Sequence, residues 1–158
     1  MPSNVELFKQ ICGLVFGQLY NSFPVRVNID VSAVASALNV ENVLYQDGKS
    51  SYGYLENGDF FLTFLDSVLV WLKDEGFIQT DSSRLTNYVI FTAKGFAGAA
   101  SIARDSVPLE AESVGSKMAK YSEEIKSKDG TQKKQAAGLL GEFAGSLIGG
   151  VTKSLGGS

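Results

Sequence analysis

One stretch of the chain, residues 60–92, restricts the fold more than any other part of the sequence. It begins with a helically spaced apolar stripe, formed by Phe61, Leu65, Val68 and Leu72 on one line, with Phe60, Phe64 and Trp71 beside it. Asn57-Gly58-Asp59 precedes the stripe and Gly76 follows it, as is typical of a helix start and a helix end. Two β segments, 77–80 and 88–92, come next around a polar loop. We therefore predict a helix over 60–75 and a small β-hairpin after it.

The N-terminal residues predict a long amphipathic helix. Ser3 and Glu6 have the spacing of a capping box, in which each side chain bonds the other's free backbone N–H. Apolar residues then recur with the helical period as far as Phe23, and Pro24 ends the pattern. Cys12 lies inside this pattern, so we expect it to be a buried core residue.

A strand and a second helix are predicted between these two long helices. Apolar and polar residues alternate over 25–29, which indicates a short half-buried strand. The helical pattern over 33–38 follows, with Asp30 or Ser32 as its cap and Asn39 as its end.

The connection to the third helix is long and less regular. Asp47-Gly48 is a turn dipeptide, so residues 43–54 form either a small hairpin or an ordered loop. After the second β segment, residues 95–103 predict another short helix.

The order helix, strand, helix, helix, strand, loop, strand resembles that of a winged helix-turn-helix domain. The resemblance covers residues 3–104. It is most specific over 65–95, which is similar to the recognition helix, the wing and the closing Thr-x-Lys-Gly turn of such domains. It implies an α+β, mainly helical domain over 1–108 with a small β-wing. It also implies DNA binding through the exposed face of the third helix, with help from the wing.

The sequence departs from that family on the surface that would contact DNA. The face of the third helix opposite the apolar stripe displays Asp59, Thr63, Asp66, Val70, Lys73 and Asp74, and the wing adds Arg84. Three acids against one lysine would repel phosphates, and the whole chain has a net charge of −3. We therefore expect DNA binding to be disfavoured, and we take Asp66, Val70 and Arg84 as candidate interaction residues.

The residue types that catalysis and metal binding use most are scarce. The chain has no histidine and one cysteine, which excludes an internal disulfide and a zinc cage. Asp74 and Glu75 are adjacent carboxylates at a helix exit, where a solvated pair is the simplest interpretation. No Gly-rich loop ends in Lys-Ser or Lys-Thr. We expect no enzymatic activity, no cofactor and no metal.

Residues 109–158 predict a helical extension of different character. A charged, helix-compatible segment over 109–127 leads to a break at Asp129-Gly130. A segment over 133–155 follows, rich in small and apolar residues. Glycines recur there at every fourth position beside an apolar half-cylinder, and six of these residues are candidate interaction residues: Gly141, Phe143, Gly145, Leu147, Ile148 and Gly149.

Three interpretations of this glycine-rich segment stay open. Small residues allow close helix–helix packing along a glycine ridge, as in a glycine zipper. The apolar half-cylinder, with Lys133 and Lys134 at its start, also fits a membrane interface. The third interpretation is a tail that is flexible or packs on its own domain. Because residues 1–104 already supply a full set of elements, we predict that 133–155 is an association element outside the core.

These patterns favour a non-enzymatic interaction module that binds a protein partner or forms an oligomer through its glycine-rich C-terminal helix. A DNA-binding transcriptional regulator is the second hypothesis. The third is a membrane-associating effector that uses the amphipathic C-terminal helix. The start of the chain does not resemble a signal peptide, and the chain contains no apolar run of about 18 residues, so a cytoplasmic location is expected.

Overall fold

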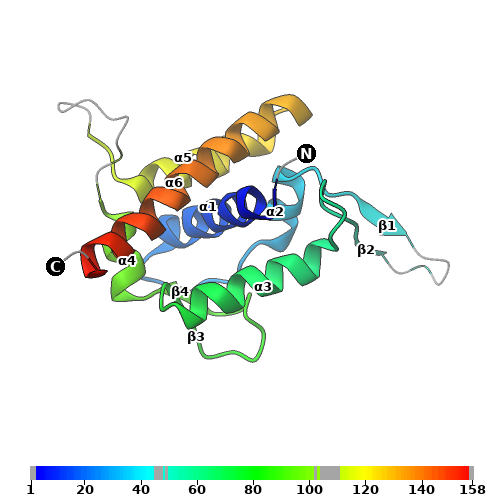
Figure 1. The fold of residues 1–158 in the computed structure, drawn as a ribbon. Coiled ribbons are helices and arrows are strands. Elements are labelled where there is room, and N and C mark those ends of the chain that lie inside the picture. Colours follow the sequence, from blue (N-terminus) through cyan, green and yellow to red (C-terminus); the bar gives the residue numbers. More distant parts are fainter. Residues whose placement is uncertain (1–2, 45–47, 49, 102, 104–110, 157–158) are drawn as a thin grey trace.

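The fold is organised around one long helix. The computed structural model describes residues 3–44, 48, 50–101, 103 and 111–156. In Figure 1, α1 (Asn4–Ser22) runs through the middle of the molecule, with α5 (Val114–Glu124) and α6 (Gly130–Gly156) on one side and α3 (Phe61–Asp74) on the other. The most extensive contacts between elements join α1 to α6 and α1 to α5. The protein is therefore α+β and mainly helical, with α1 at the centre of its core.

The signals at both ends of α1 are confirmed. The N–H of Glu6 donates to Ser3 Oγ at 3.2 Å, and the N–H of Ser3 donates to Glu6 Oε2 at 2.8 Å, which completes the capping box. The helix ends at Ser22, two residues before Pro24. Residues 11–17 are all buried, Cys12 among them, because neighbouring elements cover α1 on both sides.

The second helix is confirmed with an earlier start. α2 (Val31–Ala37) begins after Asp30, whose Oδ1 accepts from the N–H of Ala33 at 3.0 Å. It ends before Asn39, whose φ of +57° is the left-handed conformation that asparagine tolerates at a helix end.

The long connection before α3 contains a hairpin. β1 (Asn42–Leu44) and β2 (Ser50–Tyr52) pair antiparallel, with Asn42 opposite Tyr52, and they project away from the helices (Figure 1). Asp47 of the predicted turn lies outside the described residues, whereas Gly48 has the positive φ, +82°, that a tight turn requires.

Residues 60–92, which restrict the fold more than any other part of the chain, adopt the predicted structure. All four residues on the central line of α3 are buried: Phe61, Leu65, Val68 and Leu72. Gly76, with a φ of +80°, follows the helix end. β3 (Ile78–Thr80) then pairs antiparallel with β4 (Val89–Phe91), and α4 (Ala93–Ala99) follows with Thr92 as its cap.

The predicted strand over 25–29 is wrong except at one residue. Val27 and Val89 exchange both backbone hydrogen bonds, at 3.0 and 2.8 Å, as an isolated antiparallel bridge. Beyond this bridge the pairing is irregular: Tyr88 has a φ of +53°, and the N–H of Ile29 donates to the Thr86 carbonyl at 2.7 Å, one residue out of register. Side chains bond the Tyr88 backbone instead: Arg26 Nη1 donates to its carbonyl at 3.1 Å, and its N–H donates to Asn28 Oδ1 at 3.0 Å.

The prediction that 133–155 lies outside the core is also wrong. The break predicted at Asp129-Gly130 is confirmed, because the preceding helical segment ends at Ser127 and α6 begins at Gly130. Asp129 also caps α6, since its Oδ1 accepts from the N–H of Gln132 at 3.0 Å. Five residues of α6 belong to the same core as α1 and α3: Ala136, Ala137, Leu140, Ala144 and Leu147. The physical reason is that α1 is apolar on two sides, and α5, η2 (Ile125–Ser127) and α6 cover the side away from α3. The predicted boundary at Pro108 lies outside the described residues.

Two glycines of α1 allow this close packing. A Cβ on Gly13 would clash with the carbonyl oxygen of Leu140 in α6 and lie 2.7 Å from its carbonyl carbon. A Cβ on Gly17 would lie 2.7 Å from the carbonyl oxygen of Met118 in α5. The backbones of α5 and α6 therefore contact the α1 backbone directly, which glycine permits because it has no side chain.

We predict that two glycine-to-alanine changes have opposite effects on stability. Gly13→Ala should lower the free energy of unfolding by about 1–3 kcal/mol, because the new methyl group overpacks the α1–α6 contact. Gly138→Ala in α6 should raise it by up to about 1 kcal/mol, since a Cβ there meets nothing within 4 Å and alanine has the higher helix propensity. Urea titrations of both variants measure the two changes, and equal effects would contradict the packing described here.

We also predict that residues 3–129 cannot keep a native core without α6. Removal of residues 130–158 would expose the side of α1 that carries Gly13 and would leave an apolar surface uncovered. The expected result is a broad, non-cooperative thermal transition and strong binding of a hydrophobic dye. Circular dichroism and dye fluorescence test this. A truncated chain that melts as sharply, and at the same temperature, as the full chain would show that α6 is not part of the core.

Candidate interaction surface

An apolar groove lies open between the first half of α1 and α3. Its volume is about 300 Å³, and seven residues line it: Asn4, Val5 and Phe8 from α1, with Phe64, Ser67, Val68 and Trp71 from α3. We call this surface the α1–α3 groove. Phe64, Val68 and Trp71 are three or four positions apart, so they share one face of α3.

Aromatic contacts hold the floor of the groove in place. The rings of Phe8 and Trp71 meet edge to face, with centroids 5.0 Å apart. Trp71 also stacks on Phe77, with centroids 6.0 Å apart and an angle of 17° between the rings. Trp71 nevertheless stays 38% exposed and Val5 60% exposed. Large apolar side chains that are fixed in position yet open to solvent are typical of binding surfaces.

The end of the groove nearest the α3 C-terminus is acidic. Asp74 and Glu75 come three and four positions after Trp71, and both side chains are exposed. Within the described residues, neither carboxylate has an ion pair or a hydrogen bond. The nearby ammonium of Lys94 donates to the backbone carbonyl of Glu75 at 2.7 Å and lies 4.5 Å from the Phe77 ring centroid. The groove is thus apolar along its length, with two carboxylates at one end.

The candidate interaction residues Asp66, Val70 and Arg84 are all exposed. Asp66 and Val70 are four positions apart and so share one face of α3. Arg84 is in the β3–β4 loop. None of the three lines the groove.

The candidate residues of α6 divide between the core and the surface. Leu147 is buried, and Gly141 packs on α1, where a Cβ would lie 3.2 Å from Gln10 Cγ. A Cβ on Gly145 would meet the Lys9 side chain at 3.5 Å, and one on Gly149 would meet nothing within 4 Å. Among the described residues of α6, packing on the chain's own domain is the interpretation that the structure shows.

The remaining two candidates of α6 are partly covered by the chain itself. Phe143 stacks on Tyr121 of α5, with ring centroids 5.8 Å apart, and the ammonium of Lys117 lies 5.9 Å from the Phe143 ring centroid. Ile148 is half-buried against the core. These contacts leave α6 less apolar surface for association than its sequence predicts.

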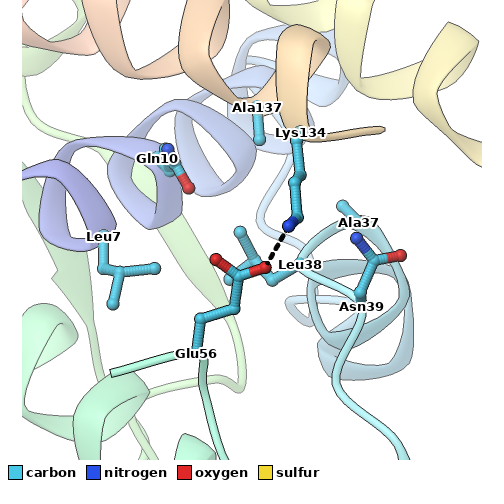
Figure 2. A pocket seen from close by; sticks show the side chains of 8 residues that line it. All are labelled: Leu7, Gln10, Ala37, Leu38, Asn39, Glu56, Lys134 and Ala137. Atoms are coloured by element: carbon cyan, nitrogen blue, oxygen red, sulfur yellow. Dashed lines mark ion pairs between the residues drawn. The ribbon is translucent and has the colours of Figure 1, made fainter. Parts of the chain in front are cut away.

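A smaller cavity of about 130 Å³ lies where α1, α2, α6 and the residues before α3 meet. Figure 2 shows the side chains of Lys134, from α6, and Glu56 pointing toward one another beside Leu7, Gln10, Leu38 and Asn39. Lys134 Nζ and Glu56 Oε1 form an ion pair of 2.7 Å. This pair connects α6 to the chain before α3. Because the acid and the base neutralise each other, the pair does not resemble a catalytic site.

A third cavity, about 250 Å³ in volume, is lined mainly by polar residues of α1, the segment before α2, α5 and η2. Most of their polar groups have partners. The Asp30 N–H donates to Gln18 Oε1 at 2.8 Å, and Lys126 pairs with Glu123 at 3.4 Å. The Ser122 hydroxyl is buried against Gly17 and has no hydrogen-bond partner within the described residues. The polar groups here mainly bind one another.

The described residues offer little for nucleophilic or metal chemistry. Burial raises the pKa of the Cys12 thiol, so the thiol stays neutral at physiological pH. In the parts of the chain that the structure describes, no three His, Cys, Asp or Glu side chains lie close enough to hold a metal ion. No described helix is long and apolar enough to cross a membrane. The α1–α3 groove instead provides an apolar surface for contact, with negative charge next to it.

Comparisons with known proteins leave this chain without a match. A scan against protein-family models found no family, and searches of curated proteins and of solved structures found no similar chain. The function is therefore inferred from the residues of this chain alone.

Sequence reasoning did not find the groove. Phe64 and Trp71 are assigned to the α3 stripe and Phe8 to the helical pattern of α1, and all three are therefore expected in the core. Val5 carries no signal of its own, because it lies in the first turn of a helix whose apolar residues are numerous. One signal is visible: the α3 stripe is wider than one buried face of a helix requires.

The ion pair in Figure 2 should contribute little to stability. Both side chains are partly exposed, at 63% for Lys134 and 37% for Glu56. A double-mutant cycle with Glu56→Gln and Lys134→Gln should give a coupling energy below about 1 kcal/mol that shrinks as salt is added. Urea titrations at low and high salt measure this energy. A coupling above about 2 kcal/mol would mean that the pair behaves as a buried one.

Proposed function

We propose that this protein is a non-enzymatic interaction module that binds a protein partner through the α1–α3 groove. The observation that carries the proposal is the exposure of Trp71 and Val5 in a groove whose floor is fixed by ring contacts. Interfaces are enriched in tryptophan at their buried centres. Leaving such a residue exposed is costly in water and is offset when a partner covers it.

We further propose that residues 3–103 are a variant of the winged-helix fold. The order α1, Val27 segment, α2, α3, β3, β4 matches the order in that family, and the Val27–Val89 bridge supplies its first strand. The β1–β2 hairpin between α2 and α3 is a departure from the family pattern. Fold alone does not assign function, so the groove and not this likeness carries the proposal.

The other two hypotheses gain less from the surface. Exposed Asp66 and Asp74 on α3 argue against DNA binding by that helix, because both would face the phosphates. Self-association or membrane binding through α6 would have to use the part of α6 that α1 and α5 leave uncovered. Within the described residues, neither the exposed face of α3 nor the uncovered part of α6 carries an exposed aromatic cluster comparable to that of the α1–α3 groove.

Photocrosslinking with a matched control tests the proposal. A photoreactive amino acid at Val5 or Ser67 should crosslink a protein partner in the source cell, because both positions line the groove. The purified partner should then change the fluorescence of Trp71, the only tryptophan of the chain.

The decisive comparison uses two arginine variants of α3. Ser67→Arg should fill the groove and reduce affinity for the purified partner by about tenfold or more, as expected when a central contact is blocked. Thr63→Arg adds the same charge at an exposed position outside the groove and should bind normally. Equal binding by both variants, with the fold intact by circular dichroism, would show that the groove is not the binding surface.

A further inference from the structure

We infer that the partner of the α1–α3 groove is an amphipathic helix with lysine or arginine at the end that lies beside Asp74 and Glu75. This inference rests on the proposed function and adds the conformation and the charge of the occupant. It is carried by the lining of the groove and by the position of these two carboxylates.

The lining of the groove favours a helical occupant. Every described residue that lines it belongs to α1 or α3. The backbone groups of both helices are bonded within the helices, so an extended peptide would find no strand edge to pair with. A groove between two helices instead accepts an apolar helix face, whose anchors at positions i, i+3 or i+4 and i+7 can reach Phe64, Val68 and Trp71.

The two carboxylates favour positive charge on that helix. Asp74 is in the last turn of α3 and Glu75 follows it, where the helix dipole presents partial negative charge. Acidic side chains at this end repel the dipole, so both residues weaken the free helix. Lys73 in the last turn, and the Lys94 ammonium that donates to the Glu75 carbonyl at 2.7 Å, offset part of the dipole. Within the described residues, however, neither the Asp74 nor the Glu75 carboxylate has an ion pair. A cation docked there would pair with these carboxylates.

Charge also separates a protein partner from a lipid surface. Most membrane surfaces that attract peripheral proteins are anionic. Asp74 and Glu75 would repel such a surface from the end of the groove, whereas a cationic helix is attracted. The charges of Asp66 and Lys73 on the exposed face of α3 cancel, so Asp74 and Glu75 set the sign of the charge there.

Selection from a displayed peptide library tests the inference with the full chain. The library consists of helical peptides with acidic, basic, neutral and apolar residues equally represented at each position, and Ser67→Arg serves for counter-selection. The expected winners carry apolar residues at i, i+3 or i+4 and i+7, together with an excess of lysine and arginine. Asp74→Lys with Glu75→Lys should shift the selection toward acidic peptides, whereas Asp66→Lys should not.

A second measurement separates charge recognition from a structural role. Asp74→Asn with Glu75→Gln should raise the melting temperature of the free protein and weaken binding of a selected basic peptide by about tenfold, read from Trp71 fluorescence. A merely structural role of these residues would move stability and affinity in the same direction, and that result would overturn the inference.

The outcomes distinguish the two proposals. Groove-dependent apolar peptides without an excess of basic residues would overturn the inference and leave the proposed function standing. If no peptide is selected that Ser67→Arg loses, both are overturned. A blue shift of Trp71 fluorescence with phosphatidylserine vesicles would assign the groove to a membrane surface and overturn the inference as well.

Discussion

The direct contact of the α1 backbone with α5 and α6 is the interaction on which the rest of the fold depends. Gly13 and Gly17 are four positions apart on one side of α1, and no other residue type would let Leu140 and Met118 approach so closely. The contact sets the distance of α5 and α6 from α1. It also places a long apolar helix where both of its sides are covered, which explains why residues 11–17 are all buried.

The same contact explains why the role of the C-terminal helix is hard to read from its own residues. An apolar half-cylinder shows that something covers α6, but its pattern cannot say whether the cover is a second copy, a lipid or the same chain. The cover is α1, about 120 residues earlier in the chain, where Gly13 admits the backbone of α6. Gly13 stands inside a continuous apolar pattern, where it is easily taken as an ordinary small residue. Leu139 stays exposed for the same reason, since the position of α1 decides which part of α6 is buried.

Local sequence signals predict the helices and strands well, because each signal depends on residues only a few positions apart. The Ser3–Glu6 capping box, the α3 stripe and the hairpin after Gly76 all depend on near neighbours, and the structure confirms them. The failures depend on partners far along the chain. The strand over 25–29 shrinks to Val27 because its pairing becomes irregular at Tyr88, a residue with no sequence signal for a positive φ. The groove is missed for a related reason: only the crossing of α1 and α3 decides which apolar residues stay open.

Local preference and global structure agree over most of this protein, and they conflict at the groove. Trp71 is held rigidly yet left partly in water, and two carboxylates stand at the end of α3 that disfavours them. The exposed part of the Trp71 ring and the two carboxylates, which have no ion pair within the described residues, each cost the free protein some stability. Folded chains keep such conflicts mainly where a partner relieves them, so their coincidence in one place is informative. Either feature alone is common on protein surfaces, where scattered apolar residues and unpaired acids carry no meaning. Together they are the basis of our proposal that a cationic amphipathic helix occupies the groove.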